Sequence, residues 1–286
     1  MEEQLNCDSK CGSCAVSSCG SRSEEQHDFC AKLHPYSKVK HVIGIVSGKG
    51  GVGKSLITSL LASETHRRGL RAAILDGDIT GPSIPQIFNT VEKAEGTQTS
   101  IFPISSKGGI QTISINNLLE DDRQPVVWRG PIVADVVKQF WSNVIWEDVD
   151  YMFVDMPPGT GDVPLTVFQS LPLDGIVIVT SPQQLVSQVV SKAVNMANMM
   201  NISILGVVEN MSYLECDNCQ NKMELYGPSH LAELTDTFAL DALARVPIQP
   251  KLAALCDAGE IETYEGVWLK EAVDTILRKI EARIAE

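Results

Sequence analysis

The sequence lacks the features that would place the protein in a membrane or on a nucleic acid. No apolar run approaches the roughly 18 residues that a membrane-spanning helix needs. Basic residues are few: 23 Lys and Arg stand against 36 Asp and Glu, and the net charge of −13 disfavours binding to phosphates of nucleic acid or of anionic membranes. The first residues, MEEQLNCDSK, lack the basic and apolar regions of a secretory signal. We therefore expect a cytoplasmic protein that binds neither nucleic acid nor membrane.

The apolar content is nevertheless sufficient for a large core. Hydrophobic residues make up 44% of the 286 residues, which predicts one or two globular domains. Residues 1–38 are polar and have no sustained apolar period, so we interpret them as a flexible, cysteine-rich arm whose order would depend on a bound metal. The globular domain is predicted to cover residues 39–286.

Short apolar strands alternate with helical stretches through this domain. Strands are predicted at 41–46, 72–75, 151–155, 176–180 and 202–208, with helices at 54–66, 132–141 and 185–200. A hairpin insertion is expected near 105–109, and a C-terminal helix in 267–286 is expected to pack on the sheet. The alternation predicts an α/β fold with a mostly parallel sheet and helices on both faces.

The first predicted strand runs into a glycine-rich loop that fits the pattern G-x-x-x-x-G-K-[ST]. Its backbone N–H groups would bind phosphate oxygens, Lys54 would reach the β- and γ-phosphates of ATP, and Ser55 would ligate Mg²⁺. The sequence therefore predicts a P-loop NTPase-type fold. The predicted nucleotide-binding loop consists of Gly48, Lys49, Gly50, Gly51, Val52, Gly53, Lys54 and Ser55.

Acidic residues at two other strand ends support this site. Asp155 ends an apolar strand, the arrangement that holds Mg²⁺ in P-loop enzymes, and Asp76 and Asp78 end the second strand at the same sheet edge. Asp78 is a candidate to orient the attacking water. Lys49 is a second lysine inside the loop, and we expect it to reach a nucleotide bound by a facing subunit. The predicted catalytic residues are thus Lys49, Lys54, Asp78 and Asp155.

Three motifs together resemble a known group of ATPases. KGGVGKS at 49–55, DGDITGPS at 76–83 and VDMPPGTGD at 154–162 resemble the deviant-Walker P-loop proteins. The sequences WRGP at 128–131 and ENMS at 209–212, with the pair Cys216 and Cys219, resemble the Mrp/ApbC-type iron–sulfur cluster carriers. The resemblance implies a homodimer that binds ATP, carries a [4Fe–4S] cluster and delivers it to apoproteins. It also implies that Asn210 contacts adenine.

Cysteine spacing points to metal binding independently of this resemblance. Cys216 and Cys219 have the C-x2-C spacing of both zinc and iron–sulfur sites, but two thiolates cannot complete a four-cysteine centre. A twofold axis joining two such pairs would complete it. A bridging [4Fe–4S] cluster and a bridging zinc fit equally, a redox disulfide is a third reading, and only the resemblance favours iron–sulfur.

The other cysteines divide into two groups. The arm carries four thiols, enough for a cluster within one chain, and Cys30 could replace one of them. Unliganded arm thiols are the alternative. Cys256 is interpreted as a small buried apolar residue, and the five histidines as structural or exposed. The arm thiols are Cys7, Cys11, Cys14 and Cys19.

Three other functions remain alternatives. A positioning ATPase of the partition or cell-division type would use a basic helix or DNA-binding surface, which this acidic chain does not display. An electron-transfer reductase like nitrogenase iron protein holds its cluster with cysteines widely separated in sequence. A zinc-bridged regulatory ATPase would differ from a cluster carrier in metal content.

Overall fold

The structure is a computed structural model that describes residues 30–79, 81–119, 130–159, 161–183, 186–216 and 218–284. The predicted arm cysteines and the motif residues Trp128 and Arg129 lie outside these ranges. Within them, eight strands form one sheet, in the order β10-β7-β6-β1-β5-β2-β4-β3. The strands are β1 (Val39–Val46), β2 (Ala72–Asp76), β3 (Ile104–Ser105), β4 (Gln111–Ile113), β5 (Val149–Asp155), β6 (Gly175–Thr180), β7 (Ile204–Glu209) and β10 (Ala242–Arg245).

All neighbouring strands of this sheet are parallel except β3, which pairs antiparallel with β4. The mostly parallel sheet and the hairpin insertion predicted from the sequence are therefore confirmed. The central strands are buried on both faces, which explains why they read as continuous apolar runs rather than as alternating patterns. Every residue of β5 and β6 is buried.

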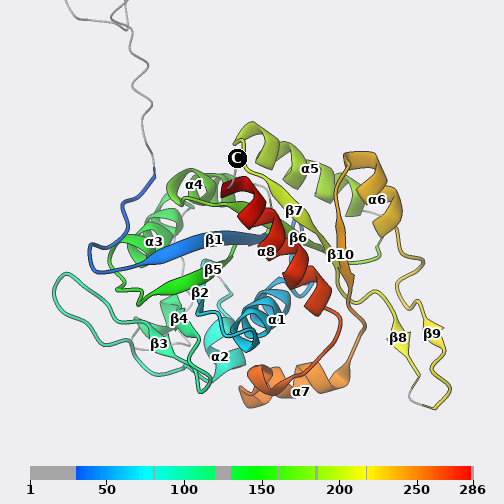
Figure 1. Cartoon of the computed structure of the whole chain (residues 1–286), viewed down its shortest axis with the longest axis horizontal. Helices are drawn as coiled ribbons and strands as arrows, with labels where there is room; N and C mark the ends of the chain where they lie inside the picture. Colours follow the sequence, from blue (N-terminus) through cyan, green and yellow to red (C-terminus); the bar gives the residue numbers. More distant parts are fainter. Residues whose placement is uncertain are drawn as a thin grey trace, which may run out of the picture.

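Helices cover both faces of the sheet (Figure 1). One core cluster includes side chains of α3, α4, α5 and α6, and the other includes side chains of α1, α2, α7 and α8. The α-helices are α1 (Lys54–Arg67), α2 (Ile84–Phe88), α3 (Gly130–Ser142), α4 (Asp162–Ser170), α5 (Val186–Met199), α6 (Leu231–Phe238), α7 (Pro250–Ala258) and α8 (Lys270–Ile284). Two 3₁₀ turns, η1 (Ile115–Asn117) and η2 (Ile261–Thr263), complete the helical elements of the described residues.

The C-terminal helix α8 packs on the sheet, as predicted. Its apolar side chains Ala272, Val273, Ile276 and Ile280 are all buried in the same core cluster as α1. Its apolar stripe is therefore satisfied inside the protein. Across the described ranges, we find no helix both long and apolar enough to span a membrane.

Residues 30–38, which the sequence assigned to the arm, pack against the body. The backbone N–H of Ala31 donates to the Ser170 carbonyl (2.8 Å), and the Trp141 indole donates to the Ala31 carbonyl (2.8 Å). The Ser37 hydroxyl donates to the Val144 carbonyl (3.0 Å). These contacts need no apolar periodicity, which is why the sequence pattern did not reveal them, and they place the start of the packed body before residue 38.

A separate two-stranded hairpin stands out from the body beside β10 (Figure 1). It consists of β8 (Leu214–Glu215) and β9 (Lys222–Met223), paired antiparallel with Leu214 opposite Met223. The hairpin follows β7 by a short connection. It therefore begins at the carboxyl edge of the sheet, where the ligand sites of open parallel sheets lie.

Candidate functional site

The glycine-rich loop lies between β1 and α1, as the motif predicts. Gly51 and Gly53 both have φ of +80°, a conformation that other L-residues rarely adopt. Gly53 directly precedes α1, and no side chain caps that helix terminus. The free backbone N–H groups and the positive end of the helix dipole can therefore bind an anion such as phosphate.

Asp155 is the centre of a buried polar cluster below this loop. Its Oδ1 lies 2.6 Å from Nζ of Lys54, and its Oδ2 accepts a hydrogen bond from the Ser55 hydroxyl at 2.5 Å. Asp155 is fully buried and Lys54 is only 6% exposed. A buried charge needs a partner, and each of these two groups provides one for the other.

Thr58 belongs to the same cluster, although sequence reasoning missed it. Its Oγ1 lies 3.0 Å from Oδ1 of Asp155 and is completely buried. The signal was available: Thr58 lies one helical turn after Lys54, so the two side chains share a face of α1. Asp155 thus contacts three side chains from the start of one helix.

The acids at the end of β2 lie beside this cluster. Oδ2 of Asp78 is 3.7 Å from Nζ of Lys54, and the backbone N–H of Gly77 donates to the Asp155 carbonyl at 2.8 Å. Asp76 is completely buried, and burial together with the nearby Asp155 charge raises the pKa of the Asp76 carboxyl to about 8. The structure therefore brings Asp76, Asp78 and Asp155 together with Lys54.

The second loop lysine points elsewhere. Nζ of Lys49 donates to Oε1 of Gln183 at 2.8 Å, in an exposed position after β6. Lys49 and Lys54 thus have different partners, and Lys49 is at the surface, where a second subunit could reach it. Its role across a dimer stays a prediction.

Asn210 supports the loop from the end of β7. Its Nδ2 donates to the Val52 carbonyl at 2.9 Å, and the side chain is 2% exposed. The fit is close: a Cβ atom added to Gly53 would lie 2.2 Å from that Nδ2 atom. The expected contact of Asn210 with adenine stays a prediction, whereas its contact with the loop is a feature of the structure.

The two paired cysteines lie at the end of the β8–β9 hairpin. The N–H of Cys216 donates to the Asn221 carbonyl (3.0 Å), and the N–H of Gln220 donates back to the Cys216 carbonyl (2.8 Å). Gln220 has a φ of +55°, which closes this tight turn. Cys216 is half-buried and Cys219 is exposed. The strands of this hairpin are two residues long, which is too short to give a strand signal in the sequence.

No set of three or more His, Cys, Asp or Glu side chains able to hold a metal occurs among the residues whose positions are described. The thiol pair would therefore need ligands from outside this set. Cys256 is half-buried on α7, and burial, with the Asp257 charge, raises the pKa of its thiol. The sequence predicted a small buried apolar residue; the side chain does pack against the apolar core cluster of α1, but it is only partly buried.

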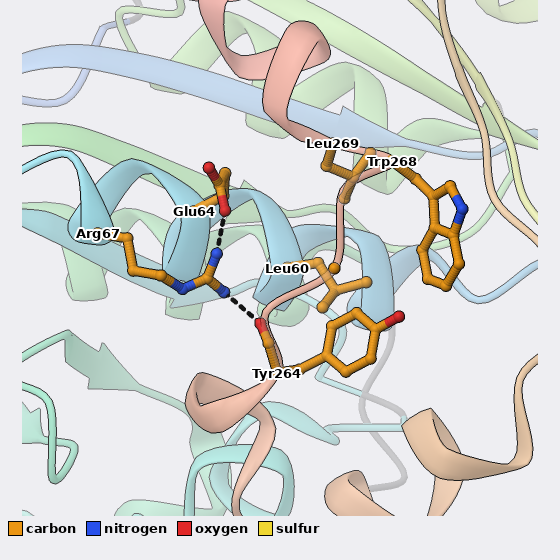
Figure 2. Close-up of a pocket in the computed structure, with 7 residues that line it drawn as sticks. Leu60, Glu64, Arg67, Tyr264, Trp268 and Leu269 are labelled. Carbon is orange, nitrogen blue, oxygen red and sulfur yellow. Dashed lines mark hydrogen bonds and ion pairs between the residues drawn. The ribbon is translucent and has the colours of Figure 1, made fainter.

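A small pocket on the other half of α1 does not involve any predicted site residue. Leu60, Glu64 and Arg67 line it from α1, opposite Tyr264, Trp268 and Leu269 (Figure 2). Arg67 bonds both Glu64 and the Tyr264 carbonyl, so it ties the helix to the segment before α8. The pocket is therefore a gap beside a structural ion pair, away from the loop.

Fold and loop geometry together define a P-loop NTPase. The family model for the NUBPL iron-transfer P-loop NTPases matches residues 38–281, and the chain belongs to this family. A protein of Clostridium perfringens named iron-sulfur cluster carrier protein is 41% identical, over 89% of this chain and 94% of the relative. A protein of Methanocaldococcus jannaschii with the same name is 38% identical, over 97% of this chain and 98% of the relative.

Solved structures of other proteins also match the fold of this chain. A nucleotide-binding protein from Archaeoglobus fulgidus in complex with ADP has a TM-score of 0.73 and 38% identity, covering 80% of this chain and 90% of that one. The cell division ATPase MinD of Pyrococcus furiosus has a TM-score of 0.60 and 18% identity, covering 85% and 99%. The second likeness shows the fold alone.

Proposed function

We propose that this protein is an ATP-hydrolysing iron–sulfur cluster carrier, which binds a [4Fe–4S] cluster between two copies of the chain and transfers it to apoproteins. The observation that carries the proposal is the presence, on one sheet edge, of a phosphate-binding loop and a projecting hairpin that ends in two thiols. Relatives that match nearly the full chain are named iron-sulfur cluster carrier proteins, which supports the proposal.

The nucleotide half of the function falls to residues of the loop and of two strand ends. Lys54 would bind the β- and γ-phosphates, and Ser55 and Asp155 would hold Mg²⁺. Their side-chain oxygens already lie 2.5 Å apart, and oxygen donors are what Mg²⁺ prefers. Mg²⁺ would neutralise phosphate charge. Asp78 would orient the attacking water, and Lys49 of a facing copy would stabilise charge on the transferred phosphoryl group.

The cluster is the cargo of the thiol pair. Cys216 and Cys219 supply two thiolates, and a four-thiolate centre then requires the same pair from a second copy. The exposed position of Cys219 allows both a second copy and a recipient protein to approach. ATP hydrolysis would be coupled to cluster transfer by changing how the two copies of the chain contact each other.

Metal analysis of protein purified without oxygen tests this function. We expect equal amounts of iron and sulfide, a [4Fe–4S] visible spectrum, and activation of an apoenzyme that needs such a cluster. Transfer is measured with ATP, with a non-hydrolysable analogue and without nucleotide. Protein that contains zinc and no sulfide, and that activates no recipient after iron and sulfide reconstitution, would instead be the zinc-bridged regulatory ATPase.

A further inference from the structure

We infer that Arg245 is a positioning residue that couples the nucleotide loop to the cysteine hairpin, so that metal on Cys216 and Cys219 changes the affinity for nucleotide and the reverse. The inference rests on the proposed function, because it assigns a coupling between its two sites. It depends on two sets of polar contacts, one between Val52 and Asn210 and one from Glu209 through Arg245 to Glu224, which are joined by the peptide bond between Glu209 and Asn210.

The first part of this connection joins the loop to the end of β7. Asn210 donates to the Val52 carbonyl, and its amide leaves no room for a side chain at Gly53. A movement of the loop on binding phosphate would therefore displace Asn210. The next residue, Met211, has a φ of +54°, a backbone conformation that costs energy in a non-glycine residue and is kept only when both neighbours are held.

The second part is a buried carboxylate beside Asn210. Glu209 is 1% exposed, and its Oε2 accepts a hydrogen bond from the Ser212 hydroxyl. Nε of Arg245 donates to the Ser212 Oγ at 2.7 Å and lies 3.4 Å from Oε2 of Glu209. Glu209 and Arg245 are also register partners in β7 and β10. Removing Arg245 would leave the buried Glu209 carboxylate without its cation, which is costly, so the pair holds the guanidinium at this end of the sheet.

The third part joins Arg245 to the hairpin. Its NH2 group lies 3.3 Å from Oε1 of Glu224, the residue directly after β9. The Arg245 guanidinium also lies over the Tyr213 ring, at 5.7 Å from the centroid, and Nζ of Lys222 lies 4.5 Å from the same centroid. One guanidinium thus contacts the sheet edge through Glu209 and the cysteine-bearing hairpin through Glu224.

The backbone makes this junction stiff. The N–H of Ser212 donates to the Val246 carbonyl (2.9 Å), and the N–H of Ile248 donates to the Tyr213 carbonyl (2.7 Å). The connection between Asn210 and the hairpin is therefore held in register against the strand that carries Arg245. Stiff connections of this kind can transmit a displacement between two sites.

The test compares one matched control with two substitutions that remove only the contact between Arg245 and Glu224. Glu224→Ala removes the hairpin acceptor of the Arg245 contact and leaves the pair of Glu209 and Arg245 intact. Arg245→Lys keeps a positive charge beside buried Glu209, but a single ammonium cannot also reach Glu224. Glu215→Ala makes the same change on β8, beside Cys216, where no contact with Arg245 exists among the described residues.

The measurement uses the full-length chain with the four arm cysteines replaced by Ser, so that Co²⁺ reports on the hairpin thiols. The dissociation constant of a fluorescent ADP analogue is measured with and without bound Co²⁺, and that of Co²⁺ with and without ADP. We expect both ratios to be equal and at least about five-fold in the parent protein and in Glu215→Ala, because coupling is reciprocal. In Glu224→Ala and Arg245→Lys, both ratios should fall to within two-fold of one.

The outcomes distinguish a failure of the coupling from a failure of the proposed function. If Co²⁺ and ADP each bind but the parent ratio is one, or if Glu224→Ala keeps the parent ratio, the coupling is refuted while the proposed function stands. If either ligand fails to bind the parent protein, the proposed function fails and the coupling fails with it. A loss of ADP affinity in metal-free Arg245→Lys equal to the loss of coupling would show a merely structural role and would also overturn the inference.

Discussion

Nζ of Lys54 lies 2.6 Å from Oδ1 of Asp155, and both side chains are buried. The lysine expected to bind phosphate is thus already the counter-charge of the acid expected to bind Mg²⁺. A nucleotide that draws Lys54 towards its phosphates would leave Asp155 without a cation. Mg²⁺ arriving with ATP would replace the lysine there, which makes joint binding of metal and nucleotide favourable.

Replacing this lysine should affect both binding and stability. Lys54→Ala removes the phosphate ligand and leaves the Asp155 carboxylate buried without its cation. We expect loss of ATP binding, by calorimetry, and a decrease of about 3 to 5 kcal/mol in the free energy of unfolding. Adding Asp155→Asn to this variant should restore most of the stability without restoring binding. ATP binding of normal affinity by Lys54→Ala would contradict the assigned site.

Lys49 should matter for hydrolysis and not for binding. Lys49→Ala leaves Lys54, Ser55 and the loop glycines unchanged, so ATP should bind normally while phosphate release falls at least about ten-fold. The control is Gln183→Ala, which removes only the partner of Lys49 seen at 2.8 Å and should hydrolyse ATP. Hydrolysis by Lys49→Ala at the unmodified rate would refute the role across the dimer.

Asp76 should make stability depend on pH when nucleotide and Mg²⁺ are absent. Its folded-state pKa of about 8 exceeds the ordinary value of 3.8, so between these values the folded protein keeps a proton that the unfolded chain releases. The contribution of this group is complete below about pH 4 and is lost as the pH rises to about 8, by at most about 1.4 kcal/mol per pH unit.

Urea unfolding between pH 5 and pH 8.5 in the presence of a chelator measures this dependence. Asp76→Asn keeps a neutral group of the same shape and should flatten the curve, so that this variant gains stability relative to the parent protein as the pH rises. Asp135→Asn, at an exposed position of α3, is the matched control and should leave the slope unchanged. An unchanged slope in Asp76→Asn would show that this carboxyl is not the titrating group.

The arm cysteines should add iron beyond that of the hairpin pair. Replacing Cys7, Cys11, Cys14 and Cys19 together by Ser removes four thiolates, the number that one cluster needs. We expect less iron and sulfide per chain, with unchanged ATP hydrolysis. Equal iron and sulfide before and after the change would show that the arm thiols hold no cluster.

The hairpin cysteines should carry the transferable cluster. In the background without arm cysteines, Cys216→Ser with Cys219→Ser should lose the cluster and the activation of recipient apoenzymes, because neutral serine is a poor iron ligand. ATP should still bind. Cys256→Ser, on α7, is the matched control and should retain the cluster.

The stoichiometry gives a second check of the bridge. With only the hairpin pair present, a shared cluster predicts about four iron atoms per dimer. Four per chain in that background, or transfer by the double-Ser variant, would each exclude a bridge.

Much of the fold could be predicted from the sequence because it depends on local patterns. The apolar run before Gly48, the eight-residue loop motif and the helix after Lys54 are contiguous, and the structure places them as predicted. The sheet acids were also found, because Asp76 and Asp155 end apolar runs. What the sequence could not give depends on partners distant along the chain.

The pair of Glu209 and Arg245 is one example. Neither residue belongs to a motif that predicts an ion pair, and they meet only because β7 and β10 are neighbours. Ser37 is another, since its contacts with the backbone of Val144 and Trp146 follow no periodicity. The β8–β9 hairpin could not be predicted for a different reason, because two-residue strands show no alternation of apolar and polar residues.

The position of β1 in the sheet determines when its neighbouring strands become available during synthesis on the ribosome. β1 is the first strand in sequence, yet its two neighbours, β5 and β6, follow only after about a hundred further residues. Asn210, which holds the loop at Val52, is synthesised later still. During synthesis the glycine-rich loop therefore leaves the ribosome long before β5, β6 and Asn210, which hold it in place. Nucleotide binding cannot assist the early stages of folding, because the binding site is not yet formed.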